Sequence, residues 1–201
     1  AKSSAAVLAA HELFEGNRDK LATLPADVRV FILRNEVKNF GSKDLFDSLL
    51  TASRQTADAS YKADICDALT ATTDPELIKQ LVVKFEDADT IKPQDLRAWF
   101  RGVLANPAGE QAAWDWIRDE WSWLEATVGG DMEFTTYITV ISRVFHTAER
   151  LAEFKAFFEP KINTPGLTRE IKMDTKVIAS RVALVEDERD AVNAAVAEVV
   201  K

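Results

Sequence analysis

Hydrophobic residues recur at steps of three and four along most of the chain, as in the run formed by Leu45, Phe46, Leu49 and Leu50. This spacing places the apolar side chains on one face of an α-helix. No stretch sustains the alternation of apolar and polar residues that a half-buried strand requires. The pattern therefore predicts helices throughout the chain.

All five tryptophans lie between positions 91 and 124. One apolar stripe in this stretch comprises Trp114, Ile117, Trp121 and Leu124, which predicts a single helix. Trp116 and Trp123 form a second stripe beside it. Because a helix that is apolar over so wide an arc needs neighbours on two sides, we expect this segment to lie in the core.

Helix-breaking residues fall at intervals of about 15 to 20 residues, which predicts around ten helices. Ser42 and the pair Asp74-Pro75 are typical helix starts. In the helix after Pro25, the spacing predicts that Val28, Phe31, Ile32 and Val37 face inward. The acidic run 186–188 predicts a break within the last helical segment, since acids favour a new helix amino terminus.

These elements predict an all-α fold in which short loops make consecutive helices antiparallel neighbours. Helix pairs of about 35 to 45 residues indicate a HEAT/armadillo-like α-solenoid, an α-α superhelix, although no strict sequence repeat occurs. A compact helical bundle is the alternative. With 201 residues and no break in composition, the chain is expected to form a single helical domain, 1–201.

The net charge of −8 and the pI of about 4.9 argue against a nucleic-acid partner, because binding phosphates requires clustered Lys and Arg. No apolar run of about 18 residues predicts a membrane segment. A single cysteine, Cys66, cannot form an internal disulfide. Its amphipathic surroundings indicate a packed residue, and we expect a soluble protein in the cytoplasm.

Candidate catalytic chemistry is sparse. His11-Glu12 begins like the zinc-protease motif His-Glu-x-x-His, but the second histidine is missing, and His146 is the only other one. No Gly-x-Ser-x-Gly, phosphate-loop or dinucleotide-binding motif occurs. We therefore expect no catalytic residues, no metal site and no cofactor in this chain.

Three groups of residues occur in a characteristic order across positions 5 to about 200. The first comprises Ala10-His11-Glu12-Leu13-Phe14 and Leu24-Pro25-Ala26-Asp27-Val28-Arg29. The second comprises Gln94-Asp95, Asn106-Pro107-x-Gly109, Ala113-Trp114-Asp115-Trp116 and Trp121-x-x-Leu124. The third comprises Phe145-x-Thr147, Phe157-Phe158 and Pro165-Gly166 before a final long helix. In this order they resemble the C-terminal helical domain of the M1 family of zinc aminopeptidases, the aminopeptidase N and endoplasmic-reticulum aminopeptidase type.

The resemblance implies that the chain is the non-catalytic C-terminal part of a longer zinc metallo-aminopeptidase, a hydrolase that removes N-terminal residues from peptides. The family's Gly-x-Met-Glu-Asn loop and zinc-binding helix, and therefore the zinc, belong to an earlier catalytic domain. This domain of the same chain and the peptide substrate are the implied partners. The C-terminal helices would enclose the active site and limit substrate access.

The resemblance also implies that basic side chains contact the peptide's carboxylate. Arg143 is the predicted peptide contact, and Arg169 and Arg181 are further candidates. An arginine on a solvated helix face is the alternative interpretation of each. For the whole chain, the alternative function is a free-standing HEAT-like scaffold for protein–protein interaction. A helical metalloenzyme is disfavoured by the two isolated histidines.

Overall fold

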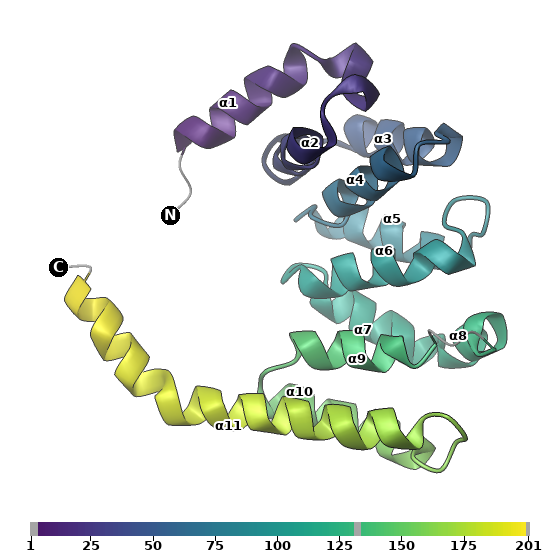
Figure 1. The fold of residues 1–201 in the computed structure, drawn as a ribbon, viewed down its shortest axis with the longest axis vertical. Coiled ribbons are helices and arrows are strands. Elements are labelled where there is room, and N and C mark those ends of the chain that lie inside the picture. The colour runs from purple at the N-terminus through teal and green to yellow at the C-terminus, as the bar shows by residue number, and fades with distance from the viewer. Residues whose placement is uncertain (1–3, 131–133, 200–201) are drawn as a thin grey trace. The chain divides into compact units, whose positions relative to one another are not determined.

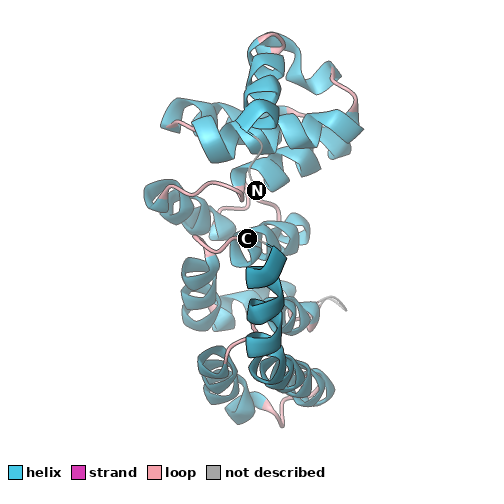
Figure 2. Cartoon of the chain, turned by 90° about the vertical axis from the view of Figure 1, so that its left-hand side faces the viewer, coloured by secondary structure: helices cyan, strands magenta, loops and turns pink. Residues whose placement is uncertain are grey.

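The computed structural model describes residues 4–130 and 134–199 (Figure 1). In these residues the chain forms eleven α-helices and three short 3₁₀ helices, with no β-strand (Figure 2). The all-α prediction is therefore confirmed. None of the helices in the described residues combines the length and the hydropathy needed to cross a membrane.

The α-helices are α1 (Ser4–Glu15), α2 (Ala26–Phe40), α3 (Lys43–Gln55), α4 (Ala59–Leu69), α5 (Pro75–Val83), α6 (Pro93–Ala105), α7 (Glu110–Asp119), α8 (Trp121–Val128), α9 (Thr136–Val144), α10 (Ala148–Phe158) and α11 (Thr168–Val199). The 3₁₀ helices are η1 (Arg18–Thr23), η2 (Lys84–Glu86) and η3 (Glu159–Lys161).

Local side chains explain where several helices begin. The Ser42 hydroxyl accepts a hydrogen bond from the backbone N–H of Leu45 at 3.2 Å, which caps α3. The Asp74 carboxylate accepts from the N–H of Glu76 at 2.8 Å at the start of α5. Pro75 occupies the first turn, where its missing N–H costs no helical hydrogen bond. Both predicted helix starts are confirmed.

The chain forms two compact units that divide between Thr127 and Val128. The first contains α1 to α7 and nearly all of α8, and the second contains α9 to α11. Each unit is described by itself. The prediction that residues 1–201 form one domain stays a prediction.

In the first unit, helices α2, α4 and α6 pack side by side. Helix α3 packs against α4, and α7 packs against both α5 and α6. Each helix thus buries its apolar face against neighbours close in the chain, as stacked helical pairs do. The largest fully buried side chains of this unit are Trp114, Phe14, Phe46, Phe85, Phe100, Leu33, Ile65, Leu69 and Leu81.

The tryptophan-rich segment is not one helix. Backbone torsions leave the helical range at Glu120, with φ −103° and ψ 17°, so α7 ends at Asp119 and α8 begins at Trp121. Trp114 and Trp121 are nevertheless both buried, as the stripe predicts. The prediction of a continuous helix is therefore wrong, and no glycine or proline in the sequence marks the break.

Helix α2 buries two of the four residues predicted to face inward, Ile32 and Val37, which are 3% and 4% exposed. Val28 is exposed and Phe31 is 70% exposed, so the prediction that they face inward is wrong. Charged residues replace them in the interior, because Arg29 and Glu36 are both only 3% exposed. Their burial depends on partners in other helices, which periodicity does not reveal.

In the second unit, α11 packs against α9 and α10. A buried carboxylate, Asp174, joins two of these helices because it accepts hydrogen bonds from Thr139 Oγ1 at 2.9 Å and Ser142 Oγ at 2.8 Å. The helix is continuous from Thr168 to Val199. The predicted break at residues 186–188 is wrong, since no glycine or proline interrupts this segment.

Candidate functional site

Arg143, the predicted peptide contact, lies in the last turn of α9 and is exposed. Its backbone carbonyl accepts a hydrogen bond from Arg181 Nη1 at 3.0 Å. Its own guanidinium forms no ion pair with any residue that the structure describes. The side chain is therefore accessible to a ligand, and its peptide contact stays a prediction.

The two further candidates differ from Arg143. Arg181 Nη1 donates to the backbone carbonyls of Ser142 at 2.7 Å, of Arg143 at 3.0 Å and of Phe145 at 3.0 Å. This guanidinium satisfies the carbonyls at the end of α9, which is a structural role. Arg169 is exposed and lies 4.0 Å from Glu170. Among the described residues, Arg143 thus presents a free guanidinium, whereas Arg181 is used in packing and Arg169 lies beside an acid.

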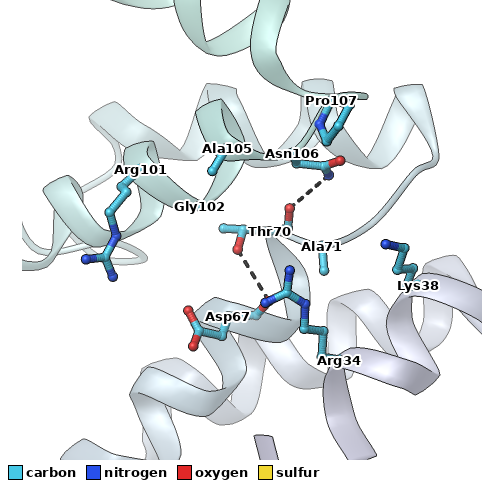
Figure 3. Close-up of a pocket in the computed structure, with 10 residues that line it drawn as sticks. All are labelled: Arg34, Lys38, Asp67, Thr70, Ala71, Arg101, Gly102, Ala105, Asn106 and Pro107. Atoms are coloured by element: carbon cyan, nitrogen blue, oxygen red, sulfur yellow. Dashed lines mark hydrogen bonds between the residues drawn. The ribbon is translucent and has the colours of Figure 1, made fainter. Parts of the chain in front are cut away.

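A pocket in the first unit gathers basic side chains that sequence reasoning did not single out. We call it the cationic pocket. It has a volume of about 250 Å³ and lies along the carboxyl-terminal turns of α2, α4 and α6. Its lining residues are Arg34, Lys38, Asp67, Thr70, Ala71, Arg101, Gly102, Ala105, Asn106 and Pro107 (Figure 3).

Charge in this pocket is opposite in sign to that of the whole chain. Arg34 and Lys38 come from α2 and Arg101 from α6, whereas Asp67 is the only acid among the described residues that line the pocket. Lys38 and Arg101 lie on opposite sides of Thr70 and Ala71 (Figure 3). None of the three cations has an ion-pair partner in residues 4–130 or 134–199. A site with three cations and one acid favours an anion.

The framework of the pocket is held by Asn106. Its side-chain amide donates to the backbone carbonyls of Thr70 at 3.0 Å and Thr72 at 2.6 Å, while its Oδ1 accepts from Ala108 N at 3.2 Å. These bonds tie the end of α6 to the end of α4. They also satisfy two carbonyls that would otherwise present negative partial charge to an anion.

Close approach of α4 and α6 sets the width of the pocket. A Cβ atom added at Gly102 would lie 2.4 Å from Thr70 Oγ1, nearer than atoms can approach. Thr70 itself is buried, and its hydroxyl donates to the Cys66 carbonyl at 2.8 Å. The glycine therefore lets the two helices pack closely enough for Arg101 to line the same pocket as Asp67.

The other predicted features have structural surroundings. Cys66 is buried, and this burial raises the pKa of its thiol well above the ordinary value, so little thiolate forms. His146 is exposed, with Nδ1 2.9 Å from the Val144 carbonyl. His11 Nδ1 lies 2.8 Å from Glu36 Oε2. Neither histidine is hydrogen-bonded to a nucleophile among the described residues.

Residues of the recognised motifs also serve packing. Arg29 is buried, and its Nε donates to Asp64 Oδ2 at 2.6 Å. The Trp116 indole donates to Glu86 Oε1 at 3.1 Å, and the Thr147 hydroxyl accepts from Arg150 N at 3.2 Å to cap α10. The motifs therefore identify a packing arrangement rather than a set of reacting groups.

The missed residues of the cationic pocket carried only a weak signal. Arg34 and Lys38 are four positions apart on one helix, and a basic residue in a last turn is a common complement to the helix dipole. Arg101 follows more than 60 positions later. Since three helices contribute to the pocket, linear spacing does not predict it.

Together, the fold and the site define a domain of stacked helices that offers a basic pocket and no activated nucleophile within its described residues. A family model for the ERAP1-like C-terminal domain matches residues 1–180. The chain belongs to this family. The resemblance inferred from the motifs is thereby confirmed.

Individual relatives agree with the family. The chain is 58% identical over 200 residues to aminopeptidase N of Lactobacillus helveticus, covering 100% of this chain and 24% of that protein. It is 36% identical over 191 residues to aminopeptidase N of Lactococcus lactis subsp. cremoris (strain MG1363), covering 94% and 22%. Identity to glutamyl aminopeptidase of Mus musculus is 24% over 168 residues, covering 83% and 18%. The chain thus spans about a quarter or less of the length of these relatives.

Proposed function

We propose that this chain is the non-catalytic C-terminal domain of a zinc metallo-aminopeptidase, and that it encloses the active site and limits which peptides reach it. The observation that carries the proposal is the family match over residues 1–180 together with 58% identity to an aminopeptidase N. The bond cleavage belongs to a zinc catalytic domain of the same polypeptide. Peptides are the proposed substrates.

The residues of this chain do not fit a role as the catalytic zinc site. His11 and His146 lie in different units and are not part of a His-Glu-x-x-His helix. The contribution of the domain is therefore to binding and access. A domain that closes over a reacting site excludes water and completes the site, and its opening admits substrate and releases product.

The cationic pocket supports a direct contact with peptide. A peptide's terminal carboxylate is a planar anion, and arginine binds it through charge-assisted hydrogen bonds. Arg34 and Arg101 are exposed and unpaired within the described residues, so a carboxylate would not have to displace another acid. We propose this pocket as a carboxylate contact and keep Arg143 as the contact predicted from the resemblance.

A cytoplasmic location is proposed on the same footing. Its support is that the single cysteine, Cys66, is buried and not in a disulfide, the bond that forms in oxidising compartments.

Deleting residues 1–201 from the full-length aminopeptidase tests the proposed enclosure. We expect the truncated enzyme to lose most of its activity and its preference for peptide length, because its active site would stay open to water and to peptides of any length. The measurement is kcat/KM for a series of peptides of increasing length. Unchanged activity and an unchanged length preference would sink the proposal.

Removing charge from the cationic pocket tests the carboxylate contact. In the full-length enzyme, Arg34→Gln with Arg101→Gln should raise KM about tenfold for peptides with a free carboxylate, the loss expected for a charge-assisted hydrogen bond. KM for the corresponding peptide amides should stay the same, because they lack the anion. Arg143→Gln, measured in the same way, tests the contact predicted from the sequence.

Arg54→Gln is the matched control, because Arg54 is an exposed arginine in the last turn of α3 and does not line the pocket. It should leave both KM values unchanged. Equal increases of KM for acid and amide peptides would show that the pocket residues do not recognise a carboxylate.

A further inference from the structure

The structure brings together a histidine and two glutamates from α1 and α2, outside the cationic pocket. One ring nitrogen of His11 and one carboxylate oxygen each of Glu15 and Glu36 lie within 4.8 Å of one another. His11 and Glu15 are four positions apart on α1, so they share a face of that helix. Glu36 reaches them from α2.

Glu36 is the unusual member of this cluster. It is 3% exposed, and among the described residues its carboxylate has no hydrogen-bond or ion-pair partner outside the cluster. A buried carboxylate ordinarily needs several donors or a cation to offset its lost hydration. The one polar partner of this carboxylate among the described residues is His11, whose Nδ1 lies 2.8 Å from Glu36 Oε2.

The other two members, His11 and Glu15, lie beside Glu36 and remain accessible to solvent. The His11 ring stacks on Phe40, with ring centroids 4.1 Å apart and an interplanar angle of 18°. Glu15 is exposed, and its one ion pair is a 3.9 Å contact with exposed Arg18. Such a pair contributes little and does not prevent Glu15 from turning toward His11.

We propose that His11, Glu15 and Glu36 bind a divalent transition-metal ion of the zinc type. Imidazole and carboxylate are ligands that such ions accept, at about 2.0–2.2 Å from the metal. Ligand atoms at this distance from a tetrahedral ion lie about 3.3–3.6 Å apart. The 2.8 Å pair of His11 and Glu36 would therefore open slightly, and the pairs up to 4.8 Å apart would close by side-chain rotation. Exposed Glu15 leaves the fourth position to water.

The ion would cross-link helices α1 and α2. Helix α1 packs against α2, but Phe14 is its one buried side chain among the described residues. A side-chain bond from Asn35 Nδ2 to the Val7 carbonyl, at 3.0 Å, is another link. A metal ion joining His11 and Glu15 to Glu36 would therefore stabilise the docking of α1, and its role would be structural.

Zinc titration of the 201-residue chain, first freed of metal with a chelator, tests the proposal. We expect one ion per chain by calorimetry, with a dissociation constant well below millimolar. At saturating zinc the Tm should rise by about 5 °C or more, because the ion binds the folded state. Hydrogen exchange should slow in α1, and cobalt should show the visible absorption of a tetrahedral site.

Three variants decide where the ion binds. His11→Gln should abolish binding, and Glu15→Gln should weaken it about tenfold or more; both residues are accessible enough to replace without opening the core. His146→Gln is the matched control, because His146 is the other histidine and lies in the second unit. It should bind zinc as the unchanged chain does.

Two results would overturn the proposal. One is the absence of saturable zinc binding below millimolar concentration, which would make the cluster a metal-free contact between His11 and Glu36. The other is binding that survives His11→Gln or is lost equally in His146→Gln. Because the measurements use binding, Tm and hydrogen exchange, they do not depend on the proposed aminopeptidase function.

Discussion

Replacing Asp64 with alanine should lower the free energy of unfolding by about 3–5 kcal/mol, the cost of leaving a buried charge without its partner. Arg29 and Asp64 have side chains only 3% and 13% exposed, and Arg29 Nε lies 2.6 Å from Asp64 Oδ2. Without the carboxylate, the guanidinium keeps its bonds to the Ala22 carbonyl at 2.7 Å and Ser60 Oγ at 3.1 Å. Its remaining carboxylate partner is the half-exposed Asp58, 3.9 Å away, which replaces a 2.6 Å buried contact only weakly. Urea unfolding followed by circular dichroism measures the change.

An exposed ion pair provides the control for Asp64. Lys79 and Glu76 lie 2.8 Å apart with side chains 69% and 78% exposed, so Lys79→Ala should change stability by less than about 1 kcal/mol. The double variant Arg29→Met with Asp64→Leu should recover much of the loss, because it removes both buried charges. A single Asp64→Ala variant as stable as Lys79→Ala would contradict the interpretation.

Replacing Trp114 with alanine should cost about 3–5 kcal/mol, the range measured for large aromatic side chains removed from a core. Trp114 lies in α7 and is 0% exposed. The Cζ atom of Arg118 lies 5.1 Å from the centroid of its ring. The loss combines transfer of apolar surface with the cavity left behind. The midpoint of urea unfolding, at an unchanged m-value, measures it.

Phe31→Ala is the control for Trp114. It also removes an aromatic ring, but Phe31 is 70% exposed on α2. Its effect on the 201-residue chain should stay within about 0.5 kcal/mol. Comparable losses at the two positions would mean that burial does not explain the contribution of Trp114.

The positions at which helices begin could be predicted because local interactions determine them. Ser42 and Asp74 accept hydrogen bonds from N–H groups two or three residues later, and the Pro75 ring selects a first-turn position through its own covalent geometry. Most of the core followed from helical periodicity, as Trp114 and Trp121 show. The motifs then identified the family, which the match over residues 1–180 confirms.

Contacts between distant positions explain what the sequence did not predict. Glu120 ends a helix without a breaker, and the burial of Arg29 on α2 depends on Asp64, 35 positions away. Likewise, Arg101 lines the same pocket as Asp67 because α4 packs closely on α6.

By itself, therefore, the sequence determined the helical class of this protein, the helix starts at Ser42 and Asp74, most of its core and its family. Each of these depends on backbone torsions, capping and apolar spacing within a few residues. Only the tertiary structure decided which charged side chains of α2 are buried, which cations share a pocket, and that Glu36 lies beside His11. The physical reason is that burial and electrostatic interaction act through space, between helices whose packing no single segment specifies.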